Sequence, residues 1–366
     1  MQAAPVFASG GPGCTSAFLQ PLAGCTSFRS QQQGLAADIG RGALASERAF
    51  GAGPALAAAA ATAAAAVSTA ARRKAARGWR GPAALNASGA DMETPEHPPA
   101  VIIGGGRVGE ALLQMGTGKD VLVRRGEPFP ADAPAGPIYV CTRNDALKDV
   151  IAMTPKERWE DLVFIQNGTL LPFLGRELGS DVPVTILLVY FAVAKKGEAP
   201  LDGKTDTDPD GLSAVNATGK WAGEVESRLT KANLACRILA EPAFTQAYWE
   251  KNLWIAAYML AGALHEGCKV GEVEAGHRQE VDSLISELAT ALTAAYPDVK
   301  WDHSVLCDRL AAYARSVAHF PTAVKEFEWR NGAFYDLSLQ AEAAGRPDPC
   351  PSHTQGLRKV GALPSA

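Results

Sequence analysis

A glycine-rich loop at residues 104–109 has the residue types and spacing of a phosphate-binding loop. The stretch VIIGGGRVGEALL begins with an apolar, strand-like run and continues into residues typical of a helix. Gly104 permits a tight turn off the strand, Gly106 lets the backbone approach a pyrophosphate, and Gly109 lets the helix pack close to the strand. An anion then binds the free N–H groups at the helix N-terminus.

This context predicts a dinucleotide site, with a purely structural turn as the alternative interpretation. The predicted site residues in the loop are Gly104, Gly105, Gly106, Arg107, Val108 and Gly109.

The strand after this helix, 121–123, ends in two arginines. An NAD-binding unit usually has an acidic side chain there, about 20 residues beyond the loop, which accepts hydrogen bonds from the ribose. The guanidinium groups of Arg124 and Arg125 instead match a 2′-phosphate in charge and geometry, so we expect the cofactor to be NADPH. A solvated basic strand end is the alternative.

The first 90 residues differ in composition from the rest of the chain. They contain eight Lys or Arg but only two acidic residues, and they are rich in Ala, Ser and Gly. Such a segment cannot bury a core, and its composition is that of an organelle transit peptide. We expect residues 1–96 to be a disordered targeting leader for a plastid, with a mitochondrion as the alternative. The Ala-rich run 54–70 is too weakly apolar for a permanent membrane span.

Charge and cysteine usage in the remaining chain exclude several classes of partner. Residues 91–366 hold 27 basic and 37 acidic residues, a net charge of −10. This field repels phosphate backbones, so no nucleic acid partner is expected. The cysteines form no C-x-x-C pair, and the histidines show no close pair at ligand spacing, so no metal site is predicted.

Strands and helices alternate after the leader. Buried strands are predicted at 137–142, 161–167 and 183–193, with a last α/β unit at 210–240. Continuous apolar strands separated by helices indicate a parallel sheet that is covered on both faces. From about Pro242 the pattern is helical, with long stretches at 243–267, 274–296 and 304–320.

The predicted fold class is therefore α/β, with two domains in sequence. A Rossmann-type NADP-binding domain spans 97–241, and an all-helical domain for substrate binding and dimerisation spans 242–366 and ends in a tail. A substrate cleft is expected between them. The aromatic residues Trp249, Trp254 and Tyr258 are interpreted as an interdomain core stripe.

Four further motifs follow one another along these elements. With their key residues they are FIQNG (Asn167), YWEKNLW (Lys251), SVAHF (Ser316) and KEFEWRNGAF (Glu326). Together with the glycine loop and the two arginines, this order resembles the ketopantoate reductases (2-dehydropantoate 2-reductases). These are NADPH enzymes of pantothenate synthesis within the 6-phosphogluconate-dehydrogenase-like group. The resemblance runs from about Val101 to Val360.

The resemblance implies a catalytic set. Lys251 would protonate the developing alkoxide during hydride transfer, Asn167 would lie beside the nicotinamide and the substrate, and Glu326 would lie near the lysine. Glu328 is the alternative glutamate. Independently of the family, a cationic donor stabilises negative charge on a ketone oxygen and supplies the proton, and a nearby carboxylate favours the charged lysine.

The resemblance also implies binding residues. Ser316 would bind the carboxylate region of the substrate, and Thr142 and Arg143, after the third strand, would contact the cofactor. Taken singly, each of these residues could be an ordinary solvated or structural side chain.

Two residues depart from the family pattern. Ile255 and Met259, four and eight residues after Lys251, occupy substrate-binding positions where the family has asparagines. An apolar pair leaves a buried hydroxyl unpaired, which costs about 1–3 kcal/mol, so we expect a less hydroxylated or branched 2-oxo acid as the substrate. The alternative function is an NADPH-binding redox sensor or assembly protein without turnover. The helical domain could also form a homodimer.

Overall fold

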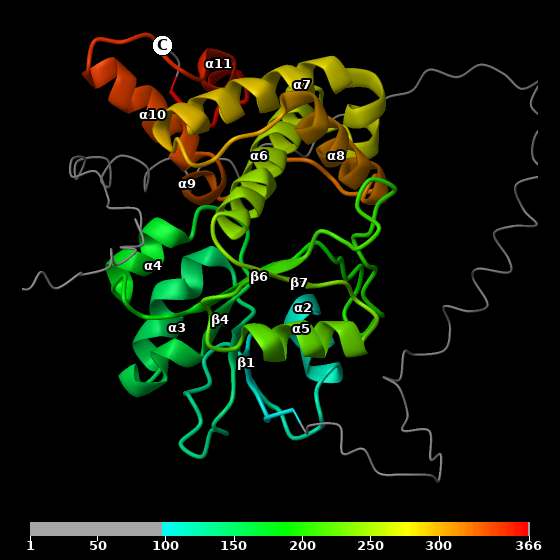
Figure 1. The fold of residues 1–366 in the computed structure, drawn as a ribbon, viewed down its shortest axis with the longest axis vertical. Helices are drawn as coiled ribbons and strands as arrows, with labels where there is room; N and C mark the ends of the chain where they lie inside the picture. The colour runs from blue at the N-terminus through cyan, green and yellow to red at the C-terminus, as the bar shows by residue number, and fades with distance from the viewer. Residues whose placement is uncertain (1–96, 365–366) are drawn as a thin grey trace, which may run out of the picture. The chain divides into compact units, whose positions relative to one another are not determined.

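The computed structural model describes residues 97–364 (Figure 1). It contains a sheet with the strand order β2-β1-β3-β4-β5-β6-β7. The strands are β1 (Val101–Ile103), β2 (Val121–Val123), β3 (Ile138–Val140), β4 (Leu162–Phe164), β5 (Thr185–Leu188), β6 (Ala214–Asn216) and β7 (Arg237–Leu239). The strand order reverses between β1 and β3. In open α/β sheets the ligand crevice lies outside the carboxyl ends of the strands at such a point.

The first five strands run parallel to one another, as predicted, but the last two are reversed. β6 pairs antiparallel with β5, and β7 pairs parallel with β6. The predicted parallel sheet is therefore confirmed for β1 to β5, whereas β6 and β7 form a reversed edge. The connection 189–213 contains no helix, whereas a parallel neighbour requires a crossover that is usually helical.

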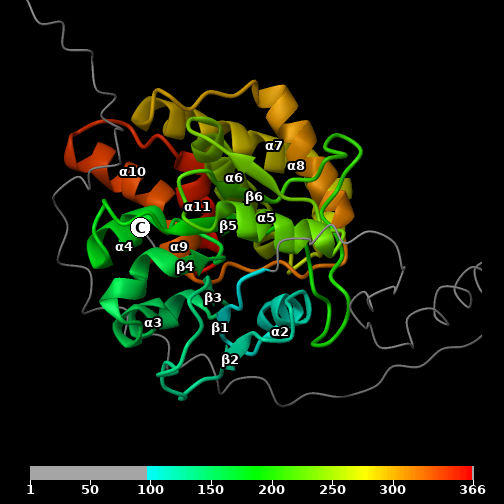
Figure 2. The same ribbon diagram turned by 60° about the horizontal axis from the view of Figure 1, so that its bottom comes forward.

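Helices cover both faces of the sheet, as expected (Figures 1 and 2). They are α2 (Arg107–Gln114), α3 (Leu147–Met153), α4 (Leu171–Glu177) and α5 (Ala222–Lys231), with short 3-10 turns η2 (Asn144–Ala146) and η3 (Lys156–Asp161). Ile102 packs with Leu112 of α2 and Leu229 of α5 on one face. Val140 packs with Val150 of α3 on the other. Because successive strand residues face opposite sides, both sets of strand side chains are buried.

The chain after β7 is helical. Its helices are α6 (Ala243–Leu264), α7 (Val270–Ala295), α8 (His303–Ser316), α9 (Phe327–Arg330), α10 (Gly332–Ala343) and α11 (Pro351–Lys359). The first three correspond to the predicted stretches, although α7 is kinked at His277 and α8 ends at Ser316. The described residues belong to one compact unit, so the division at residue 242 stays a prediction.

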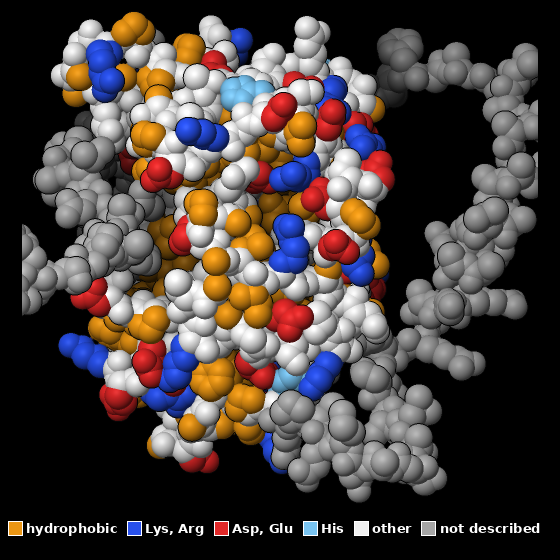
Figure 3. Space-filling model, in the orientation of Figure 1, with side chains coloured by type: hydrophobic (Ala, Val, Ile, Leu, Met, Phe, Trp, Pro, Cys, Tyr) orange, Lys and Arg blue, Asp and Glu red, His pale blue; other side chains and the backbone are white. Residues whose placement is uncertain are grey.

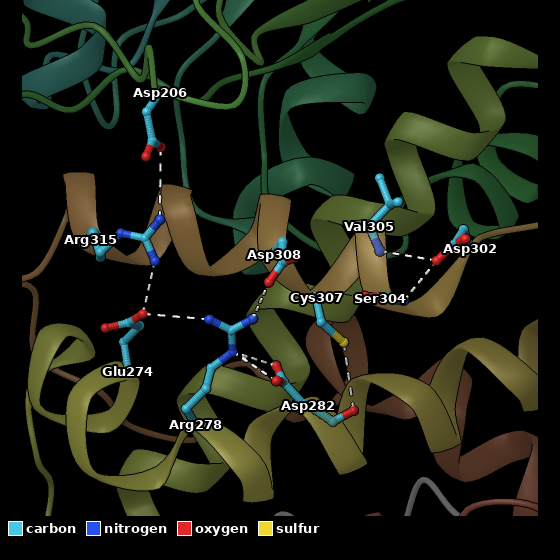
Figure 4. Close-up of polar contacts among 10 residues, drawn as sticks. All are labelled: Asp206, Glu274, Arg278, Asp282, Asp302, Ser304, Val305, Cys307, Asp308 and Arg315. Atoms are coloured by element: carbon cyan, nitrogen blue, oxygen red, sulfur yellow. Dashed lines mark hydrogen bonds and ion pairs between the residues drawn. The ribbon is translucent and has the colours of Figure 1, made fainter.

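Ion pairs connect α7, α8 and the loop before β6 (Figure 4). Arg278 contacts Glu274 at 3.6 Å and Asp308 at 2.9 Å. Arg315 contacts Glu274 at 2.9 Å and Asp206, in the loop, at 3.8 Å. Such partly exposed pairs contribute at most about 1 kcal/mol each, so they orient α8 more than they stabilise it.

Surface charge is mixed on the face shown in Figure 3, where basic and acidic side chains are interspersed. This face therefore lacks the continuous basic stripe that binds phosphate backbones. Within 97–364, no helix is both long and apolar enough to span a membrane. The predicted targeting leader lies outside the described residues.

Candidate active site

The glycine loop has the backbone geometry that its sequence predicts. Gly104 has a φ of +112°, and a Cβ on Gly109 would overlap the carbonyl oxygen of Gly104. A side chain at either position would push α2 away from β1 and β3. These two glycines therefore shape the turn itself.

Three observations show that a dinucleotide phosphate fits at this loop. A Cβ on Gly106 would meet no atom within 4 Å, so this face of the loop is open. No described side chain caps the α2 N-terminus, which begins at Arg107. The hydroxyl of Thr142, whose backbone faces Gly104, is buried and has no hydrogen-bond partner in the described chain. A helix N-terminus and an unpaired hydroxyl are both available to a phosphate.

The open side of the loop allows a test that separates binding from folding. We expect Gly106→Val to keep the fold, because the residue has an ordinary φ of −77° and free space around it. It should weaken NADPH binding by at least about tenfold, or 1.4 kcal/mol, by blocking the phosphate. Gly223→Val is the matched control, because its Cβ would also meet no atom within 4 Å. Unchanged NADPH affinity in Gly106→Val, measured by calorimetry, would contradict this location.

Arg124 lies beside the loop, where a Cβ on Gly105 would be 3.6 Å from its Cγ atom. The side chains of Arg124 and Arg125 are exposed and form no ion pair within residues 97–364. The nearest acid, Glu127, accepts a hydrogen bond from the backbone N–H of Arg124 at 2.6 Å. Arg143, exposed after the end of β3, pairs with Asp145 at 3.3 Å.

A cavity of about 360 Å³ opens beside the loop, between the strand ends and the helices. It is lined by Arg107, Val108, Ile165, Asn167, Val189, Tyr190, Phe191, Ala192, Val193, Lys251, Trp254, Ile255, Met259, Tyr313, Phe320, Pro321 and Arg330. The cavity thus brings together the predicted residues Asn167, Lys251, Ile255 and Met259. Most of its lining residues have apolar or aromatic side chains and three are cationic, as is usual for a small-molecule site.

Lys251 is a buried cation in the first part of α6. Its ammonium group donates a hydrogen bond to the carbonyl oxygen of Val189 and lies 4.3 Å from the ring centroid of Tyr190. Burial, assisted by the positive charge of Arg330, lowers the pKa of Lys251 to about 7. A group with this pKa can both hold and release a proton near neutral pH.

Asn167 and Arg330 are held together by the backbone. The N–H of Thr169, just after the QNG turn, donates to the carbonyl oxygen of Trp329 at 2.7 Å. Gly168, with a φ of +112°, permits this approach, since a Cβ there would lie 2.5 Å from the same oxygen. The FIQNG and KEFEWRNGAF motifs, which are far apart in the sequence, are therefore in contact in the structure.

Two members of the predicted catalytic and substrate-binding set, Ser316 and Glu326, do not line the cavity. Ser316 is exposed, and its hydroxyl donates to the carbonyl oxygen of Tyr313 at 2.8 Å. Glu326 forms an ion pair with Arg330 at 2.6 Å instead of approaching Lys251, and Glu328 is exposed. Neither glutamate therefore stabilises the charged form of Lys251, and the pKa of Lys251 is lowered instead of raised.

Most of the other lining residues are not predicted from the sequence. Among them, Trp254 is interpreted as a core residue, and Tyr313, Phe320 and Arg330 have no predicted role. Arg330 directly precedes Asn331 in the KEFEWRNGAF motif. This position is the sequence feature that could have indicated Arg330 as a site residue.

Outside the cavity, the structure brings together three side chains that could bind a metal ion. The ligand atoms of His265, His277 and Glu280 lie within 4.8 Å of one another. His265 pairs with Glu280 at 2.6 Å, and its ring stacks on that of His277. The spacing of the histidines along the sequence does not reveal this cluster, because the connection between α6 and α7 reverses the chain.

Comparisons with known proteins support the class of fold. No family model matches the sequence, and no curated protein matches it. The structure is similar to D-mandelate dehydrogenase in a ternary structure with NADH and anilino(oxo)acetate. The TM-score is 0.52 at 12% identity, over 71% of this chain and 98% of that chain.

It is also similar to a dimeric ketopantoate reductase from Staphylococcus aureus. The TM-score is 0.50 at 16% identity, over 72% of this chain and 98% of that chain. The chain has the fold of these NAD(P)-dependent 2-oxo acid reductases, in which a Rossmann-like sheet is followed by a helical region. This fold confirms the predicted fold class.

Proposed function

We propose that this protein is an NADPH-dependent reductase of a 2-oxo acid that has an apolar side chain. The observation that carries the proposal is the position of Lys251, buried in the cavity beside the glycine loop and Asn167, with a pKa lowered to about 7. A lysine without a chemical task is rarely buried in this way, because burial of its charge is costly.

The chemistry needs one proton from the protein. Bound NADPH would supply a hydride to the ketone carbon. Lys251 would donate its proton to the ketone oxygen as negative charge develops there. Asn167 would orient the reacting groups, and the apolar wall would exclude water from them. Gly104 to Gly109, Thr142 and Arg143 would hold the cofactor.

The cavity wall supports an apolar substrate side chain. Ile255 and Met259 offer no hydrogen bond, and Trp254, Tyr313 and Phe320 add aromatic surface. Ketopantoate has a hydroxyl group that this wall would leave unpaired, at a cost of about 1–3 kcal/mol. The similar D-mandelate dehydrogenase was solved with anilino(oxo)acetate, which carries an aromatic ring.

The experiment compares kcat/KM for phenylpyruvate and for ketopantoate. We expect a preference for phenylpyruvate of at least about tenfold. In Ile255→Asn this ratio should fall, because the amide pairs with the hydroxyl of ketopantoate, whereas Val305→Asn, at an exposed residue outside the cavity, should keep it. Preferred turnover of ketopantoate by the unmodified protein would contradict the proposed substrate class.

The preference for NADPH rests on the exposed side chains of Arg124 and Arg125. We expect the double substitution of both to Ala to weaken NADPH binding by about 1.5–3 kcal/mol, because charge-assisted hydrogen bonds to the 2′-phosphate are lost. NADH binding should not change. Arg176→Ala, at another exposed arginine, is the control. Equal losses for NADH and NADPH would show that the arginines do not select the cofactor.

Two further proposals concern the location of the protein in the cell and its oligomeric state. The basic, acid-poor segment before residue 91 supports import into a plastid, with a mitochondrion as the alternative. The similar reductase from Staphylococcus aureus is described as dimeric, which supports a homodimer here.

A further inference from the structure

The charged side chains that line the cavity are all cationic. Its lining includes the cationic residues Arg107, Lys251 and Arg330, whereas none of the described lining residues is an Asp or a Glu. Arg107 donates a hydrogen bond to the carbonyl oxygen of Ala194 at 2.9 Å at the exposed edge. A cavity with this charge favours an anionic ligand.

Arg330 has hydrogen-bonding capacity that the described chain leaves unused. One terminal nitrogen pairs with Glu326, but the buried Nε has no partner in residues 97–364. A guanidinium group has five N–H donors in a fixed plane, and two of them match a carboxylate. The buried Nε is not accessible to a ligand, but the other terminal nitrogen, Nη1, also has no partner within residues 97–364 and is the donor that a carboxylate in the cavity would reach.

The backbone at Arg330 is fixed on both sides. On one side the carbonyl oxygen of Trp329 accepts from the N–H of Thr169. On the other, the buried side chain of Asn331 contacts His353 Nε2 at 3.0 Å, and burial lowers the pKa of His353 to about 4. His353 is therefore neutral, and Asn331 is held without a competing charge. An arginine on such a support is preorganised for binding.

We propose that Arg330 binds the carboxylate of the 2-oxo acid, so that the adjacent ketone oxygen faces Lys251. This assignment rests on the proposed function, and no motif of the resembling family suggested it. The carboxylate carbon and the ketone carbon of a 2-oxo acid are bonded to each other. A 2-oxo acid can therefore contact two cations of one cavity at once, one that binds the carboxylate and one that donates a proton, and this cavity has both in Arg330 and Lys251.

The same contact would control the proton on Lys251. In the empty cavity the charge of Arg330 helps to lower the pKa of that lysine. A carboxylate bound to Arg330 offsets this charge, so Lys251 regains affinity for its proton as the substrate binds. The ketone carbon then accepts the hydride with its electron pair, and the ketone oxygen takes the proton from Lys251. After release of the 2-hydroxy acid, the neutral amine takes a proton from water.

Binding of anilino(oxo)acetate, an unreactive 2-oxo acid analogue, tests the proposal without turnover. The probe would be titrated into the NADPH-loaded 366-residue chain, and its binding would be followed by calorimetry. We expect Arg330→Met to weaken its binding on the order of 10–100-fold, and Arg330→Lys to weaken it less. The neutral amide of the probe should bind equally to all three proteins. Arg358→Met, at an exposed arginine outside the cavity, should bind the probe like the unmodified protein.

The pH profile supplies a second measurement. In the unmodified protein, the pH dependence of kcat should give a higher pKa for Lys251 than the pH dependence of kcat/KM. The reason is that kcat reports the enzyme with bound substrate, whereas kcat/KM reports the free enzyme. In Arg330→Lys this difference should shrink. Undiminished probe binding in Arg330→Met, together with continued reduction of 2-oxo acids, would overturn the role of Arg330 and leave the proposed function intact. If the unmodified protein neither binds the probe nor reduces any 2-oxo acid, both are overturned.

Discussion

Substitution of Lys251 by Met is expected to reduce kcat for 2-oxo acid reduction by about 10²–10⁴-fold. The lysine ammonium is buried and lines the same cavity as Asn167, and the developing alkoxide would lie beside it. NADPH affinity should remain unchanged, because Lys251 is not part of the glycine loop. Steady-state kinetics and NADPH titration of the same preparation measure both quantities.

The same variant should not lose stability. Because the pKa of Lys251 is lowered from 10.5 to about 7, the unfolded chain binds this proton more tightly than the folded chain does. The penalty on folding is full below about pH 7 and is gone above about pH 10.5, and Met removes it at every pH. Lys300→Met, at an exposed lysine, is the control. A destabilised Lys251→Met with normal kcat would show a structural lysine instead of a proton donor.

The pH dependence of the unmodified enzyme follows from the same pKa. Reduction requires the protonated amine, so kcat/KM should fall as the pH rises through about 7. Oxidation of the 2-hydroxy acid requires the neutral amine and should rise over the same range.

Substitution of Arg228 by Met is expected to lower the free energy of unfolding by about 3–5 kcal/mol, because it leaves a buried carboxylate without its partner. Arg228 of α5 is 1% exposed, and it pairs with Asp120, which is 0% exposed, at 2.6 Å. The guanidinium group also lies 5.0 Å from the ring centroid of Tyr139. Asp120 accepts the backbone N–H of Ala100 just before β1, so the pair connects α5 to the strand that leads into the glycine loop.

Urea denaturation of the full chain measures this effect. Arg346→Met, at an exposed arginine, should change the free energy of unfolding by less than about 0.5 kcal/mol. Adding Asp120→Asn to Arg228→Met should recover part of the loss, because the unpaired charge is removed. A loss below about 1 kcal/mol in Arg228→Met would contradict the account of this pair.

Local patterns in the sequence were sufficient to predict the glycine loop, the strands and α6. The predicted strand 183–193 ends earlier, at Leu188, because its last residues leave the sheet and line the cavity. Apolar composition cannot distinguish a strand from an apolar cavity wall, since both are buried. The orientation of β6 depends on how the long loop returns, which no local pattern specifies.

The positions of the side chains after α8 could not be predicted from motif order alone. Glu326 has a left-handed backbone with a φ of 48°, which turns the chain into the short helix α9 and directs its carboxylate to Arg330. Ser316 ends α8 and bonds back to its own helix. A motif fixes the spacing along the chain, but the direction of each side chain depends on turns between motifs.

Transfer of label from NADPH to the product tests the central claim most directly. The 366-residue chain would be incubated with phenylpyruvate and NADPH carrying two deuterium atoms at C4 of the nicotinamide, and the product would be analysed by mass spectrometry. A reductase of this class yields the 2-hydroxy acid with one deuterium at C2, and Lys251→Met forms it far more slowly. Tight binding of NADPH with no labelled 2-hydroxy acid from any 2-oxo acid would contradict the account and indicate an NADPH-binding protein without turnover.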